Sequence, residues 1–182
     1  MFLLLFLILG FGWGLLRGGS LHCLINHRLR WSGSVLVALL LQLIVFSPLG
    51  KQWTVLEAPV LHVASYILLA IFVGANIQHQ GFWLMGAGLL SNLVVIVANG
   101  GYMPTPSEHL AWLGLAEDSI LNNSTIIHSG TVLWWLGDIF LLPLPAIGNV
   151  FSIGDVALGV GVAYFAYHAM EPIRPFGKQT RS

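Results

Sequence analysis

Long apolar runs alternate with short polar segments along this chain, and the runs have the length of membrane-crossing helices. A helix that crosses a bilayer needs roughly 20 apolar residues, within a working range of about 17–25. Five runs reach or approach that length, and they cover residues 2–16, 35–49, 59–76, 82–99 and 153–170. The pattern predicts an all-α integral membrane protein in which one domain, residues 1–182, contains five transmembrane helices.

A further apolar run, residues 131–147, has a different character. It contains Asp138 and two prolines, Pro143 and Pro145. Each proline removes a backbone donor and clashes with the preceding turn, so a helix does not continue through both. We therefore expect an interfacial or re-entrant segment here instead of a sixth span.

Composition supports this interpretation. Apolar residues make up 57% of the chain and charged residues only 8%, whereas soluble domains carry about 25% charged residues. So few charges exclude a soluble enzyme or a disordered chain, and seven scattered Lys and Arg residues make no face for a nucleic acid. The single cysteine, Cys23, excludes a cysteine-based metal site, and no metal is predicted.

The basic residues set an orientation. With five spans, six of the seven fall on one side of the membrane and only Lys51 falls on the other; the six are Arg17, Arg28, Arg30, Arg174, Lys178 and Arg181. Cytoplasmic loops carry such an excess of Lys and Arg. The N-terminus is therefore predicted outside and the C-terminus inside, with residues 100–130 as an external loop. The first run lacks a basic start, so we expect it to be a retained helix and not a signal peptide.

Two carboxylates are candidates for chemistry. Asp138 and Asp155 both lie in apolar sequence near the predicted outer face, where an ionised side chain is costly and by default functional. Two carboxyls in one pocket share a proton, which supplies a base for water and an acid for a leaving amine. The structural alternatives stay open. Ser152 and Asp155 have the spacing of a capping box, and Asp138 is compatible with an interfacial acid satisfied by backbone or water.

These residues carry a resemblance. Residues 130–165 resemble the C-terminal part of bacterial lipoprotein signal peptidase (signal peptidase II), in which an Asp precedes a Phe-Asn-x-Ala-Asp motif that opens the last helix. The matching pieces are Trp135-Leu136-Gly137-Asp138-Ile139 and Phe151-Ser152-Ile153-Gly154-Asp155. The resemblance implies an aspartic membrane peptidase without a cofactor, a lipid-modified protein substrate, Asp138 and Asp155 as the catalytic pair, and Asn99 and Ser152 in support. The sequence departs from the motif at Ser152 and Gly154.

A wider likeness covers most of the chain. Ala98-Asn99-Gly100-Gly101-Tyr102-Met103-Pro104 and Phe151-Ser152-Ile153-Gly154-Asp155 are similar to motifs of an uncharacterised family of small bacterial polytopic membrane proteins. This likeness implies a multi-pass protein of the bacterial cytoplasmic (inner) membrane. It implies no activity.

Two histidines suggest an alternative. His62 lies in the third predicted span and His168 near the inner end of the fifth, and neutral imidazole binds haem, chlorophyll or a quinone oxygen. Small residues in the last span allow another helix, of this chain or of a partner, to approach closely. A non-catalytic accessory subunit of a photosynthetic or respiratory complex, in contact with pigment, haem, quinone, lipid or other subunits, therefore stays open beside the peptidase.

Overall fold

Five long helices form the body of the protein. The computed structural model describes residues 2–46, 57–114, 123–144 and 148–170, which are mostly helical. The long helices are α1 (Phe2–Leu16), α3 (Ser32–Phe46), α4 (Glu57–Ala75), α5 (Phe82–Ala98) and α7 (Ile153–Ala169). Each coincides with one predicted apolar run, although α3 begins three residues early and residues 47–49 of that run lie outside the described residues.

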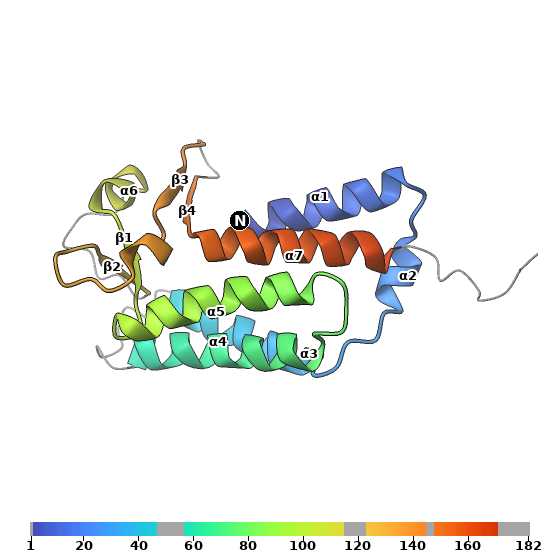
Figure 1. Ribbon diagram of the computed structural model, residues 1–182, viewed down its shortest axis with the longest axis horizontal. Coiled ribbons are helices and arrows are strands. Elements are labelled where there is room, and N and C mark those ends of the chain that lie inside the picture. Colours follow the sequence, from blue (N-terminus) through green and yellow to red (C-terminus); the bar gives the residue numbers. More distant parts are fainter. Residues whose placement is uncertain (1, 47–56, 115–122, 145–147, 171–182) are drawn as a thin grey trace, which may run out of the picture.

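The helices pack as a row in the order α1, α7, α5, α4, α3. Figure 1 shows α1 and α7 side by side above α5, with α4 and α3 below. Neighbouring helices run in opposite directions, with the exception of α1 and α7, which are parallel. Consequently α1, α4 and α7 all begin at the same end of the bundle, where α3 and α5 end.

Small residues set the distances around α7. Its Gly154 and Gly161 lie against α5, where a β-carbon on Gly161 would come within 2.7 Å of the Gly81 carbonyl oxygen. Its Gly159 lies against the Phe6 ring of α1, and Gly10 of α1 lies against the Ala163 backbone. The small residues expected to admit a neighbouring helix therefore do so on two faces, and both neighbours belong to the same chain.

Short strands and turns cover the end of the bundle where α7 begins. β1 (Met103–Thr105) pairs in parallel with β2 (Ser124–Ile126), and α6 (Ser107–Trp112) lies between them in sequence. A 3₁₀ turn, η2 (Trp134–Leu136), leads into β3 (Phe140–Leu142), which pairs antiparallel with β4 (Asn149–Phe151). The predicted external loop is thus partly structured. In its described part, the 131–147 segment has no helix beyond η2 and makes no sixth helical span.

Asn76 organises the opposite end. After α2 (Leu21–Ile25), the chain passes beneath the α4–α5 turn, where the buried Asn76 side chain accepts a hydrogen bond from the Arg30 N–H (2.9 Å) and donates to the Arg30 carbonyl (2.8 Å). It also donates to the Phe72 carbonyl at 2.8 Å. One side chain therefore joins the α2–α3 connection to α4.

Replacing Asn76 with alanine is expected to destabilise the protein by about 2 kcal/mol, because it leaves buried backbone groups of the connection without partners. The measurement is thermal unfolding of the purified protein, with limited proteolysis around Arg30. Gln78→Ala, at an exposed position of the same turn, is the matched control and should change neither result. Equal effects of the two substitutions would contradict this role of Asn76.

By helix length, the structure supports fewer membrane-crossing helices than the five predicted from the sequence. Among the described residues, Ala58–Ala75 is the one helix both long and apolar enough to cross a membrane by length and composition. The other four are shorter apolar helices: Leu3–Leu16, Ser32–Val45, Phe82–Ala98 and Ile153–Ala169. The prediction of five spans is therefore not borne out by length alone.

Candidate active site

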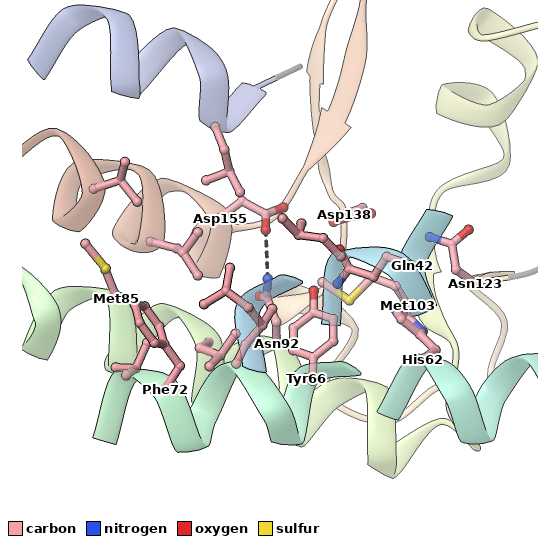
Figure 2. A pocket seen from close by; sticks show the side chains of 18 residues that line it. Gln42, His62, Tyr66, Phe72, Met85, Asn92, Met103, Asn123, Asp138 and Asp155 are labelled. Atoms are coloured by element: carbon pink, nitrogen blue, oxygen red, sulfur yellow. Dashed lines mark hydrogen bonds between the residues drawn. The ribbon is translucent and has the colours of Figure 1, made fainter. Parts of the chain in front are cut away.

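The two aspartates singled out in the sequence line one cavity. The cavity has a volume of about 360 Å³ and takes side chains from all five long helices. It includes Leu3 of α1 and Leu39 of α3, which belong to the two outermost helices of the row, so the row curves around it. Polar side chains gather near the strand-covered end, as Figure 2 shows; they are Gln42, His62, Tyr66, Asn92, Asn123, Asp138 and Asp155.

The β3–β4 hairpin brings the aspartates together. Its register pairs Phe140 with Phe151, and the two rings stack at 5.5 Å between centroids. Asp138 precedes the first strand by two residues and Asp155 follows the second by four, so the pairing returns the chain to the same place. The hairpin thus forms in and just after residues 131–147, the segment that the sequence predicts to be interfacial or re-entrant.

Pro104 holds the Asp138 backbone from the other side. The Asp138 N–H donates to the Pro104 carbonyl at 2.8 Å. Gly137 is required at this contact, because a β-carbon there would collide with that same carbonyl oxygen. β1 therefore places Asp138 directly beside the end of α5.

Asp155 sits in the first turn of α7. The Ser152 side chain accepts from the Asp155 N–H at 3.0 Å, and Asp155 Oδ2 accepts from the Ser152 N–H at 3.0 Å. This is the capping box read from the sequence, so the predicted structural role of Ser152 and Asp155 is confirmed. The same turn directs the Asp155 carboxylate into the cavity (Figure 2), and the cap and the cavity position are compatible.

Asn92, in the middle of α5, links the site together. Its amide donates to Asp155 Oδ1 at 2.8 Å and its own oxygen accepts from the Ser152 hydroxyl at 2.8 Å. The Asn92 side chain also interacts with the Tyr66 hydroxyl, which points toward the aspartates in Figure 2. Sequence reasoning missed both residues. The signal for Asn92 was present, since an amide inside an apolar helix needs a partner.

The two carboxyls influence each other. Burial of the Asp138 carboxyl, and then the nearby charge of Asp155, raise the pKa of Asp138 from 3.8 to about 8. The Asp138 carboxyl makes no hydrogen bond to any residue that the structure describes, whereas Asp155 accepts from two N–H donors. At neutral pH the Asp138 carboxyl therefore keeps its proton, as the acid of a pair of catalytic carboxylates must.

Asn99 lies outside the cavity and acts on the backbone. It ends α5, and its side chain donates to the Val132 carbonyl (2.8 Å) and accepts from the Val132 N–H (3.0 Å). These bonds fix the start of the segment that carries Asp138. The glycines that follow have positive φ, +70° at Gly100 and +95° at Gly101, which turns the chain sharply into β1. Asn99, expected to support the site, therefore reaches it only through the backbone of the segment that carries Asp138.

The two candidate ligand histidines lie at opposite ends of the bundle. His62 lines the cavity, is buried, and its Nδ1 lies 2.9 Å from the Gly101 carbonyl oxygen, to which it donates. His168 lies in the last turn of α7 between the rings of Tyr164 and Tyr167. The structure does not bring them together around one cofactor. Within the described ranges, no three His, Cys, Asp or Glu side chains form a group that could hold a metal ion.

Comparison with known proteins identifies a family. Residues 26–167 match a family of unknown function, DUF5317, and the chain belongs to it. No curated protein and no solved structure matches the chain. The expected membership of an uncharacterised family is thus confirmed, whereas the resemblance to signal peptidase II receives no support from these comparisons and stays a prediction.

Proposed function

We propose that this member of the DUF5317 family is a five-span protein of the bacterial cytoplasmic membrane that hydrolyses an amide bond at the outer face, with Asp138 and Asp155 as its catalytic residues. The observation that carries the proposal is the placement of both carboxyls in one cavity, Asp155 held by N–H donors and Asp138 with no donor among the described residues.

The apolar exterior supports membrane insertion. Large side chains face outward along every long helix, among them Ile8 (56% exposed), Leu43 (66%), Val60 (65%), Leu90 (55%) and Val160 (41%). The five helices contain only two charged residues, Glu57 and Asp155, both in first turns. A monomer in water rarely exposes so continuous an apolar surface. Helices of 15 to 17 residues rise about 22–26 Å, which a bilayer accommodates by thinning locally.

The charges at the two ends support the orientation. Arg17, Arg28 and Arg30 follow α1 and precede α3, at the end where α7 finishes. Asp138, Asp155 and Glu108 belong to the strand-covered end. The excess of basic residues at one end favours the cytoplasm for that end, so the strand-covered end with the two aspartates is placed at the outer face in this proposal.

The proposed reaction uses the two carboxyls in different protonation states. The Asp155 carboxylate takes a proton from a water molecule, whose oxygen bonds to the carbonyl carbon of the substrate. As the C–N bond breaks, protonated Asp138 gives its proton to the leaving nitrogen. A proton passed from Asp155 to Asp138 then restores the starting state.

The shape of the cavity favours a lipid-modified substrate. Apolar lining continues from the aspartates into the bundle along α4, from Tyr66 to Val73, a rise of about 10 Å. Leu89 of α5 and Leu158 of α7 line the same part. Alkyl groups of a lipid fit such a lining better than a polar peptide does.

The test is cleavage of a lipid-modified precursor protein by the purified chain in liposomes. We expect cleavage by the wild type and a loss of at least about 100-fold for Asp155→Asn. Glu108→Gln is the matched control, since Glu108 is an exposed carboxylate on α6 at the same end and its loss should leave turnover unchanged. Undiminished cleavage by Asp155→Asn, or none by the wild type, would contradict the proposal.

The accessory-subunit alternative remains a second proposal with less support. A shared haem or pigment between His62 and His168 would need them at one depth, and they lie at opposite ends of the bundle. His62 alone faces the cavity. Gentle solubilisation of native membranes, followed by sizing of the particle, separates a monomer from a subunit of a larger complex.

A further inference from the structure

The polar end of the cavity has negative charge and no matching positive charge. Of the described residues that line it, two are carboxylic acids and none is Lys or Arg. The described arginines, Arg17, Arg28 and Arg30, belong to the other end of the bundle. Neutral N–H donors from Ser152 and Asn92 orient the Asp155 carboxylate, but they do not cancel its charge. A charge left uncompensated in apolar surroundings is costly.

Asp138 adds an unused acceptor. The Asp138 side chain is half-buried, faces the cavity and has no hydrogen-bond partner among the described residues. A polar group that lies in largely apolar surroundings without a partner costs stability. A ligand that brought N–H donors and a positive charge between Asp138 and Asp155 would satisfy both residues.

The apolar part of the cavity defines the rest of such a ligand. Leu69, Val73, Met85 and Val162 line it from three helices, and no described charged residue interrupts this stretch. An unbranched alkyl chain could extend from the aspartates along this wall. A phosphate head group in the same place would instead lie against Asp155 without a cation, so like charges would repel.

We propose that the cavity binds a single-chain alkylammonium, with its ammonium group between Asp138 and Asp155 and its alkyl chain along α4. Hydrolysis of an amide releases an amine, so this ligand class also resembles a product of the proposed reaction. The binding itself requires only the cavity, and it holds or fails independently of hydrolysis.

The experiment compares three amphiphiles of equal chain length. Dodecylammonium, dodecanol and dodecyl phosphate are added at equal concentration to the purified protein in a neutral detergent, and thermal unfolding is measured at pH 7. We expect dodecylammonium to raise the Tm by about 5 °C at saturation. Dodecanol and dodecyl phosphate, which enter the same micelles, should raise it by much less.

Two variants locate the binding. Asp138→Asn removes no described hydrogen bond, so this variant should fold. It should lose most of the rise in Tm caused by dodecylammonium. Asp155→Asn should lose it too, whereas Glu108→Gln should keep it. Equal shifts from all three amphiphiles, or a full shift in Asp138→Asn, would overturn the inference.

The outcome is separable from that of the proposed function. A dodecylammonium shift that requires both aspartates, in a protein that cleaves no precursor, would retain this binding site and reject the hydrolase. Cleavage that requires both aspartates, without any selective shift, would retain the hydrolase and reject the alkylammonium site.

Discussion

Asp138→Asn is expected to lower turnover by at least about 100-fold while it makes the protein more stable. The substitution removes the proton donor of the proposed reaction. It also removes a carboxyl that lies in the cavity without a described hydrogen-bond partner, and so relieves a cost that the folded protein carries. We expect a gain of about 1 kcal/mol at pH 8, or roughly 3 °C in Tm.

The dependence of stability on pH explains why Asp138→Asn should be more stable than the wild type at high pH. The pKa of Asp138 is raised from 3.8 to about 8 in the folded protein. Between these values the unfolded chain releases the proton and the folded protein keeps it, so the contribution of Asp138 to stability is present below about pH 4 and is lost as the pH rises to about 8. Asparagine has no such proton. The stability of Asp138→Asn relative to wild type should therefore grow from pH 4 to pH 8.

Asp155→Asn provides the contrast. It exchanges an acceptor of the Ser152 N–H for an amide that can present a donor, and it weakens the cap of α7. We therefore expect Asp155→Asn to lower the Tm and Asp138→Asn to raise it, although both should lower turnover in the proposed reaction. Thermal unfolding at pH 5 and pH 8 distinguishes the two. A lower Tm for Asp138→Asn at pH 8 would contradict the inference that the Asp138 carboxyl destabilises the folded protein at that pH.

Gly88→Val is expected to destabilise the bundle by about 3 kcal/mol or more, or to prevent the protein from accumulating in cells. A β-carbon on Gly88 would collide with the Gly154 carbonyl oxygen and lie 2.7 Å from the Leu158 backbone nitrogen. Both contacts are with backbone atoms of α7, which can give way only if α5 and α7 move apart. Such a movement would separate Asn92 from Asp155. Overpacking of this kind costs about 1–3 kcal/mol even where side chains can adjust.

The control for this prediction is Gly74→Val. Gly74 is an exposed helical glycine of α4, and a β-carbon there would meet no atom within 4 Å. The same chemical change should therefore be nearly neutral. Yield after detergent extraction and thermal unfolding measure both variants, and similar behaviour of the two would show that the α5–α7 contact is looser than described.

The sequence alone was sufficient for the helices and for part of the site. Apolar runs bounded by Gly, Pro and Asn located the long helices to within a few residues, because apolar length and helix breakers are local properties. The capping box at Ser152 and Asp155 is equally local. The prediction that Asp138 and Asp155 are close depended on their position beside the last helix and on a resemblance, not on any local rule.

The long-range contacts of the site could not be predicted from the sequence. Residues 140–142 and 149–151 are too short and too apolar to be distinguished from a broken helix by periodicity, so the sequence predicts an interfacial or re-entrant segment over residues 131–147 and not the hairpin. Asn92 lies 63 residues from Asp155, and Tyr66 lies on a third helix. Their roles follow from the order of the helices in the row, which apolar patterns do not specify.

The parallel contact of α1 with α7 constrains the order in which the protein can fold during its synthesis. Leu3 of α1 and Asp155 of α7 line the same cavity, yet the first leaves the ribosome long before the second. Until α7 has been synthesised, α1 has no described neighbour of comparable extent in the bundle. The cavity can therefore form only once α7 has been synthesised, and a prematurely terminated chain would have neither the second aspartate nor a docked first helix.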